Sequence, residues 1–140
     1  AGWDWACLQL ADGRELMVYQ MRQKTGGLDP CSTLAWVDQK GRLTQVGPAD
    51  FSLTPKRQWR SPLTGAQYPV GMTLRAPDPA GGPPLVMTLE PLLDAQEHAG
   101  TLSRIPYWEG ACLVRDPAGK TIGQAYLELT GYAATLGGRF

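Results

Sequence analysis

The chain has 140 residues, and its 13 basic and 13 acidic side chains give a formal net charge of zero. That length suits one domain with a single hydrophobic core. Charges of opposite sign are interspersed without a basic stripe, which argues against nucleic acid as a partner. No apolar run approaches the roughly 20 residues of a membrane span. We therefore expect residues 1–140 to form one domain without a transmembrane segment.

The cysteines and acidic residues indicate no metal site. Cys7, Cys31 and Cys112 are widely spaced and form no Cys-x-x-Cys motif. Cys7 and Cys112 fall inside strand-like runs, where a thiol acts as a small buried hydrophobe, although their spacing does not exclude one disulfide. No short stretch gathers carboxylates. The sequence therefore predicts neither a metal nor a cofactor.

Strand-like runs separated by turns account for most of the chain. Seventeen glycines and twelve prolines interrupt the sequence at short intervals, a pattern typical of strands joined by turns. Only residues 94–99 could form a helical turn. The predicted strands cover residues 5–10, 14–21, 32–37, 42–46, 51–53, 57–59, 70–75 and 85–93, and a hairpin of two long strands closes the chain.

About ten strands joined by hairpin-length connections, without crossover helices, predict an all-β antiparallel up-and-down β-barrel or a closely related sandwich. The second strand is apolar on both faces: Met17, Tyr19 and Met21 share one face, and Leu16 and Val18 share the other. Since one face packs inside, the other is expected to meet a partner domain or a ligand. The alternative is an ordinary barrel with a wide apolar surface.

Most catalytic motifs are absent from the sequence. It contains no Gly-x-Ser-x-Gly elbow, no phosphate-binding loop and no His-Glu-x-x-His, and His98 is its single histidine. What remains is the closing hairpin, in which Glu109 and Glu128 each have apolar neighbours on both sides. Because burial of an unpaired carboxylate is costly, these two glutamates are the candidate catalytic residues.

The turn Asp116-Pro117-Ala118-Gly119 sets the register of this hairpin. If the glycine that ends the turn forms a bulge, Trp108 lies opposite Glu128 and Glu109 falls on the other face. A plain two-residue loop instead places Glu109 opposite Tyr126 and gathers tyrosines and glutamates on one face. Turn chemistry favours the bulge.

A glutamate among aromatic rings can serve chemistry or structure. Desolvation raises the pKa of a carboxyl group in such a pocket, which suits a general acid. A structural glutamate would instead accept hydrogen bonds from tyrosine or tryptophan and hold the barrel closed. The candidate substrate-binding residues are Trp5, Tyr19, Tyr107, Trp108 and Tyr126.

Several motifs together resemble one known family. They are Gly2-Trp3-Asp4-Trp5, Trp59-Arg60-Ser61-Pro62-Leu63-Thr64-Gly65, Tyr68-Pro69, Glu90-Pro91-Leu92-Leu93-Asp94, Tyr107-Trp108-Glu109-Gly110-Ala111 and Tyr126-Leu127-Glu128-Leu129-Thr130-Gly131-Tyr132. The chain resembles the C-terminal lipocalin-like domain of the carotenoid 1,2-hydratase family, which also holds predicted secreted hydrolases. The resemblance covers essentially the whole chain.

The resemblance implies a lipocalin-like barrel that forms the C-terminal domain of a two-barrel parent. It also implies a periplasmic or secreted protein that binds a hydrophobic small molecule or helps to hydrate or hydrolyse it. The expected partner is the N-terminal lipocalin-like domain of the same parent, with a homodimer as the alternative. The family's His-x-Trp-type element is absent from this sequence, so we expect the isolated domain to be inactive as an enzyme.

Three functions follow, and the barrel interior distinguishes them. A hydratase or hydrolase would use Glu109 or Glu128 as its general acid, in a cavity lined by a carboxylate and tyrosines. A non-catalytic binding module would have an open, purely apolar cavity. A structural module would be filled with side chains and would support its partner domain.

Overall fold

The computed structural model describes residues 2–99 and 105–133 of the chain. Ten strands form one antiparallel sheet, and the described residues contain no helix, so none of them forms a helix that could cross a membrane. The predicted all-β fold of about ten strands is confirmed. The strands are β1 (Gly2–Leu10), β2 (Glu15–Arg22), β3 (Thr33–Val37), β4 (Leu43–Val46), β5 (Ser52–Arg60), β6 (Gln67–Ala76), β7 (Leu85–Pro91), β8 (Glu97–His98), β9 (Tyr107–Arg115) and β10 (Thr121–Leu129).

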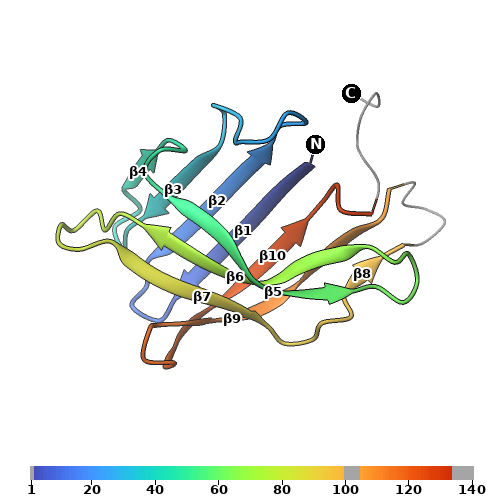
Figure 1. The fold of residues 1–140 in the computed structure, drawn as a ribbon. Coiled ribbons are helices and arrows are strands. Elements are labelled where there is room, and N and C mark those ends of the chain that lie inside the picture. Colours follow the sequence, from blue (N-terminus) through green and yellow to red (C-terminus); the bar gives the residue numbers. More distant parts are fainter. Residues whose placement is uncertain (1, 100–104, 134–140) are drawn as a thin grey trace.

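The sheet curls so that its two halves face each other (Figure 1). Its order is β4-β3-β2-β1-β10-β9-β7-β6-β5, and the short β8 pairs with β9. The first and last strands are therefore neighbours in the middle of the sheet, whereas β4 and β5 form its edges. The result is a half-barrel that opens between β4 and β5.

Two sets of hydrogen bonds hold this curl. At the seam between the first and last strands, the Trp3 N–H donates to Thr130 Oγ1 and the Thr130 N–H donates to the Trp3 carbonyl oxygen, each at 2.9 Å. Across the interior, Gln20 Nε2 on β2 donates to the Leu53 carbonyl oxygen on β5 at 3.3 Å. The second bond joins the two facing halves of the sheet directly.

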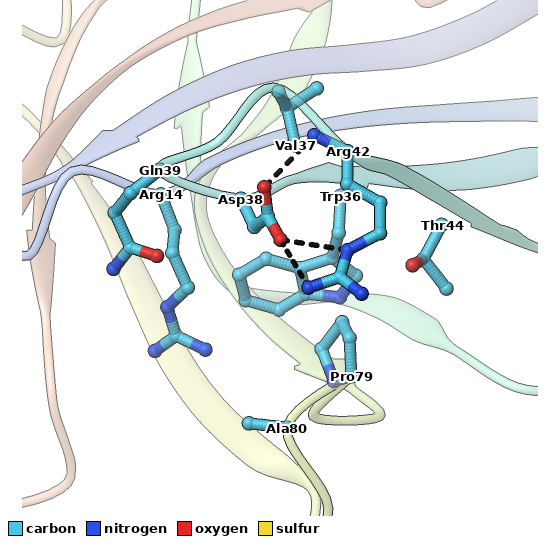
Figure 2. A pocket seen from close by; sticks show the side chains of 9 residues that line it. All are labelled: Arg14, Trp36, Val37, Asp38, Gln39, Arg42, Thr44, Pro79 and Ala80. Atoms are coloured by element: carbon cyan, nitrogen blue, oxygen red, sulfur yellow. Dashed lines mark hydrogen bonds and ion pairs between the residues drawn. The ribbon is translucent and has the colours of Figure 1, made fainter.

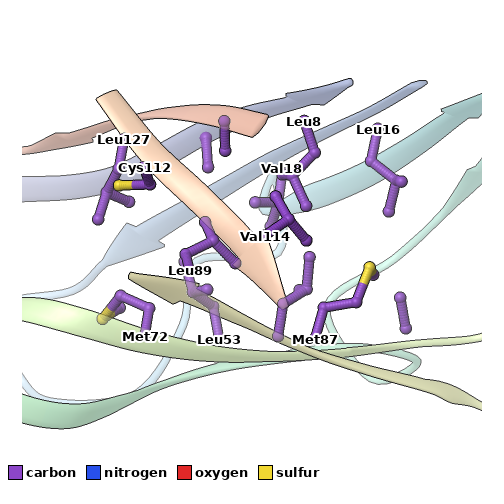
Figure 3. Close-up of a cluster of buried hydrophobic side chains, with 14 of the residues drawn as sticks. Leu8, Leu16, Val18, Leu53, Met72, Met87, Leu89, Cys112, Val114 and Leu127 are labelled. Atoms are coloured by element: carbon purple, nitrogen blue, oxygen red, sulfur yellow. The ribbon is translucent and has the colours of Figure 1, made fainter. Parts of the chain in front are cut away.

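Alternate residues of each strand point into the space between the halves, as the period of a β-strand requires. Leu8 and Val18 from one half meet Leu53, Met87 and Val114 from the other (Figure 3). The largest fully buried side chains are Trp36, Trp108, Tyr68, Leu8, Leu16, Leu34, Met72, Leu74, Met87, Leu89, Leu127 and Leu129.

Two local predictions were wrong. The short strands expected on either side of Pro55 are one strand, β5, with register shifts between Pro55 and Arg57 and between Arg57 and Trp59. Because β5 is an edge strand, a proline can be accommodated there despite its missing N–H. Residues 94–99 form no helical turn, since Glu97–His98 is the strand β8 instead.

Candidate functional site

A second bulge decides which residues meet in the β9–β10 hairpin. The Asp116 N–H donates to the Lys120 carbonyl oxygen at 3.0 Å, as the bulged turn predicts. The register then shifts once more between Thr121 and Gly123. A side chain at position 123 would clash with the carbonyl oxygen of Gln9 on β1. Glycine therefore permits the irregular strand to lie close against its neighbour.

This shift places Glu109 directly opposite Glu128 and Trp108 opposite Leu129. Both registers expected from the turn alone were wrong, because each counted residues outward from the turn without the second irregularity. The consequence is chemical: two carboxylates occupy adjacent positions on one face of the sheet, where like charges repel.

The two glutamates lie on the outer face of the sheet, away from the core. Trp108 is buried, whereas the Glu109 side chain keeps 27% of its surface exposed. On the neighbouring strands, Trp5 pairs with Glu128 on one side and with Tyr19 on the other. Tyr19, Trp5, Glu128 and Glu109 therefore form one row across β2, β1, β10 and β9.

Tyrosine and histidine side chains flank this row. His98 stacks on Tyr107 with ring centroids 5.1 Å apart, and His98 Nε2 is 3.6 Å from Glu109 Oε1. Burial, and next the charge of Glu109, raise the pKa of the Tyr126 hydroxyl. His98 was missed as a site residue because β8 was not predicted. We define the outer-face cluster as Trp5, Tyr19, His98, Tyr107, Glu109, Tyr126 and Glu128.

The electrostatics of the outer-face cluster link its tyrosines to its carboxylates. Burial raises the pKa of the Tyr19, Tyr107 and Tyr126 hydroxyls, and the charge of Glu128 raises all three further. Glu109 has the same effect on the pKa of Tyr107 and Tyr126. The three tyrosines therefore stay protonated at neutral pH and can donate hydrogen bonds.

A hollow of about 380 Å³ adjoins the outer-face cluster at Tyr126, a size typical of small-molecule sites. Leu92 and Leu113 supply apolar walls, while Gln9 and Gln124 supply the amide groups. The outer face thus offers an apolar recess beside a carboxylate pair. The recess is lined by Cys7, Gln9, Leu92, Ala111, Cys112, Leu113, Gln124, Ala125 and Tyr126.

Trp108 lies apart from the other candidate residues. It is fully buried in the core, where its Nε1–H donates to the Asp94 carbonyl oxygen at 2.7 Å. The structure therefore gathers both glutamates with four of the five aromatic candidates and places the fifth on the opposite face. That separation follows directly from the alternation along β9.

The barrel interior is packed with side chains. Trp36, Tyr68 and Trp108 are each at most 2% exposed and fill it together with aliphatic residues from both halves. Glu109 and Glu128 do not line this interior, because they face outward. Any ligand that meets the two carboxylates must approach the outer face of the sheet.

The sequence reasoning missed a buried polar network inside the half-barrel. Asp4 is only 1% exposed and forms an ion pair with Arg22. It also accepts hydrogen bonds from the Tyr132 hydroxyl at 2.8 Å and from Gln20 Nε2 at 3.3 Å. The Arg22 guanidinium lies over the Tyr132 ring, 4.2 Å from its centroid. The alternation of β1 could have revealed it: Asp4 and Leu8 are an even number of residues apart, so both side chains point to the same, buried face.

A second carboxylate, Glu97, adjoins this network. It accepts hydrogen bonds from the hydroxyls of Thr64 at 2.6 Å, Tyr68 at 2.9 Å, and Ser61. The Tyr68 and Tyr132 ring centroids are 5.7 Å apart, so the two groups are continuous. Because both carboxylates have several hydrogen-bond donors, we assign them a structural role in holding the barrel together.

Within residues 2–99 and 105–133, no three His, Cys, Asp or Glu side chains gather where they could hold a metal ion. The cysteines are free: Cys112 is buried, Cys7 is half-buried and Cys31 is exposed. The one disulfide that the spacing left open is therefore not formed. The chemistry available at the outer face is that of carboxylates, phenols and one imidazole.

The curled antiparallel sheet, with its filled interior, defines a lipocalin-like β-barrel module. The chain belongs to the AttH-like family, whose family model matches residues 1–132. A solved protein described as an AttH from Nitrosomonas europaea is similar over 94% of this chain, with 35% identity and a TM-score of 0.79. Kievitone hydratase from Nectria haematococca shares the fold over 95% of this chain, with 15% identity and a TM-score of 0.66. No curated protein matches the chain.

The chain spans only part of these relatives, namely 39% of the Nitrosomonas europaea protein and 40% of kievitone hydratase. The resemblance expected from the motifs is confirmed at the level of an AttH-like, lipocalin-like domain whose fold a hydratase shares.

Proposed function

We propose that the outer-face cluster binds a hydrophobic molecule, and that Glu109 and Glu128 act on it as an acid–base pair in a hydration or hydrolysis reaction. The observation that carries this proposal is the direct opposition of the two carboxylates among aromatic side chains. Like charges placed opposite each other lower the stability of a sheet. Clustered groups that cost stability are typical of functional sites.

The class of ligand follows from the groups around the carboxylates. Trp5, Tyr19 and Tyr126 present aromatic surface on the outer face, and the adjoining hollow has the apolar walls Leu92 and Leu113. Burial of apolar surface against such groups is favourable in proportion to area. A hydrophobic molecule that lies along the row would bring one of its bonds next to Glu109 and Glu128.

The reaction divides between the two carboxyl groups. In hydration, the protonated carboxyl donates its proton to one carbon of a substrate double bond. The ionised carboxylate takes a proton from water as the water oxygen bonds to the neighbouring carbon. The pair thus ends with its single proton transferred from one glutamate to the other. Tyr107 and Tyr126, which stay protonated, orient the water.

The activity is tested with the full-length protein and squalene, a polyisoprenoid alkene, as the probe. Mass spectrometry should detect a product that is heavier by one water. Glu109→Gln and Glu128→Gln should each lower its rate of formation about a hundredfold or more, because each removes a transferable proton. Glu15→Gln, at an exposed position of β2, is the matched control. A rate that is equal in all three variants contradicts the assignment.

Binding by the chain itself is tested with Nile red, a neutral lipophilic dye whose fluorescence rises in apolar surroundings. Trp5→Ala and Tyr126→Ala should weaken dye binding about tenfold, as expected for aromatic anchors. Leu43→Ala removes an apolar side chain that is 61% exposed on the edge strand β4, and it should leave binding unchanged. Equal affinities for all variants would mean that Nile red does not bind at the outer-face cluster.

The filled interior favours a second candidate function, that of a structural module which supports a partner domain. In that case the outer face is a docking surface, and the glutamates act through hydrogen bonds. Glu109→Gln and Glu128→Gln would then alter stability, with Nile red binding and turnover unaffected. The two candidates therefore differ in which measurement responds to the same pair of substitutions.

The proposal also includes a partner and a location. We propose that this barrel is the C-terminal domain of a two-barrel parent and that its partner is the N-terminal lipocalin-like domain of the same chain. Export to the periplasm or the medium rests on the family resemblance alone. Light scattering of this chain tests the homodimer: a dimer that Trp5→Lys dissociates would favour self-association through the outer face.

A further inference from the structure

A second pocket, separate from the outer-face cluster, lies at the end of the barrel where the β1–β2, β3–β4 and β6–β7 turns meet. Its volume of about 330 Å³ suits a small ligand. Figure 2 shows the indole of Trp36 at its centre, between Arg14 on one side and Arg42 on the other. The pocket is lined by Arg14, Trp36, Val37, Asp38, Gln39, Arg42, Thr44, Pro79 and Ala80.

Trp36 carries an unsatisfied hydrogen-bond donor in this pocket. Trp36 is 2% exposed, and its Nε1 is the one buried side-chain nitrogen or oxygen without a partner among the residues that the structure describes. The nitrogen is on the side of the ring toward Arg42 and Pro79 (Figure 2). A buried donor without an acceptor costs free energy. An oxygen atom of a ligand that accepted this N–H would remove that cost.

The carboxylate in the lining cannot supply that oxygen. Asp38 Oδ1 accepts hydrogen bonds from the backbone N–H groups of Lys40 and Arg42, each at 2.9 Å. Asp38 Oδ2 accepts hydrogen bonds from Nε and from a terminal nitrogen of the Arg42 side chain, each at 3.0 Å. Both oxygens of Asp38 are therefore already used within the turn.

The two arginines differ in what they leave available. Arg14 is held by Asp12 at 2.8 Å and by Asp78 at 3.1 Å, and its Cζ lies 5.0 Å from the centroid of the Trp36 ring. It therefore fixes the indole. Arg42 bonds only one edge of its guanidinium to Asp38, and its side chain is 76% exposed. Arg42 and Trp36 therefore both keep unused hydrogen-bond donors in this pocket.

We propose that this pocket binds a small organic carboxylate. One carboxylate oxygen accepts the Trp36 N–H, and the planar group meets the free edge of Arg42, the pairing for which a guanidinium is shaped. Asp12, Asp38 and Asp78 outnumber Arg14 and Arg42 by one charge. Net charge therefore does not favour the anion, so binding rests on the hydrogen bonds from Trp36 and Arg42 and its affinity is modest. The proposal is independent of the reaction assigned to the outer-face cluster.

The test follows the five indole N–H resonances of the ¹⁵N-labelled chain by NMR. Trp36→Phe identifies the Trp36 signal by its disappearance. Acetate should move that signal saturably, while acetamide, a neutral molecule of the same shape, should move it much less. Arg42→Gln should weaken acetate binding about tenfold or more, whereas Arg75→Gln, at an exposed position of β6, should not.

Three results would overturn the proposal. The first is a Trp36 signal that does not respond to acetate, which would leave water as the acceptor. The second is an equal affinity for acetate in Arg42→Gln and in the unsubstituted chain. The third is tighter binding of inorganic phosphate than of acetate, which would assign the pocket to a different class of anion.

Discussion

Glu109 on β9 and Glu128 on β10 are direct cross-strand partners on the outer face of the sheet. Their surroundings differ. Glu109 Oε1 lies 3.6 Å from His98 Nε2, whereas the cross-strand neighbours of Glu128 are Glu109 and Trp5. The two glutamates should therefore respond differently to the same substitution.

Glu128→Gln should raise the melting temperature, because it removes a like charge opposite Glu109. The expected gain is about 0.2–1 kcal/mol, the range for cross-strand pairs. Glu109→Gln also weakens the contact with His98 Nε2, so its net effect should be smaller or unfavourable. Thermal melts at neutral pH measure both, with Glu15→Gln as the control for loss of one charge. A lower melting temperature for Glu128→Gln would instead support a structural, hydrogen-bonded glutamate.

Gly123→Ala should destabilise the barrel by about 1–3 kcal/mol, the usual cost of overpacking. The added methyl group would meet the Gln9 carbonyl and lie 3.0 Å from the Leu10 Cα, so backbone atoms rather than a flexible side chain would have to move. Gly47→Ala is the matched control, because nothing lies within 4 Å of its added Cβ. Urea denaturation of both variants tests this, and equal midpoints would show that the seam tolerates the shift.

Arg22→Met should be strongly destabilising, because it leaves the Asp4 carboxylate buried without its ion-pair partner. Breaking one half of a buried pair typically costs about 3–5 kcal/mol. Arg75→Met changes the same residue type at an exposed position and should cost little. Chemical denaturation gives both values. A small effect for Arg22→Met would mean that Tyr132 and Gln20 suffice to hold the charge.

Stability should fall at alkaline pH, in part through Cys112. Burial raises the pKa of this thiol from 9.0 to about 12 in the folded chain. The folded state therefore keeps the proton more tightly than the unfolded state. The resulting stabilisation is complete below pH 9.0 and is lost as the pH rises toward about 12, by up to about 1.4 kcal/mol per pH unit.

Denaturation at a series of pH values above 9 tests this contribution of Cys112. Cys112→Ala should lower stability at neutral pH but flatten its alkaline decline. Cys31→Ala, at an exposed thiol, should leave the slope unchanged. Parallel slopes in all three proteins would show that Cys112 does not cause the alkaline loss of stability. Tyr68 and Tyr132, whose pKa values burial also raises, would then be the remaining candidates.

Most of the fold could be predicted because it depends on local signals. Glycines and prolines marked the turns, and alternation marked the strands, so the approximate number of strands and their antiparallel pairing followed. The irregular positions could not be predicted in this way. Pro55 was predicted to separate two short strands. A strand can include a proline when it lies at the edge of the sheet, and the position of β5 at the edge is a property of the assembled sheet.

The candidate site could be predicted in composition but not in geometry. Glu109 and Glu128 stood out as carboxylates among apolar neighbours, yet their direct opposition depends on a bulge beside Gly123. That bulge reflects close contact with β1, which lies far away in the sequence. Asp4 and His98 were missed for the same reason: their partners come from other strands, and no local pattern marks them.

The seam between β1 and β10 has a consequence for folding kinetics. Nearly every other strand pair in the sheet joins neighbours in the sequence, whereas Trp3 and Thr130 are 127 positions apart. Hairpins within each half can form rapidly and independently, but the seam must close almost the entire chain into one loop. Closure of this single long-range contact should therefore limit the rate of folding, and until it forms, β1 and β10 each expose an unpaired edge.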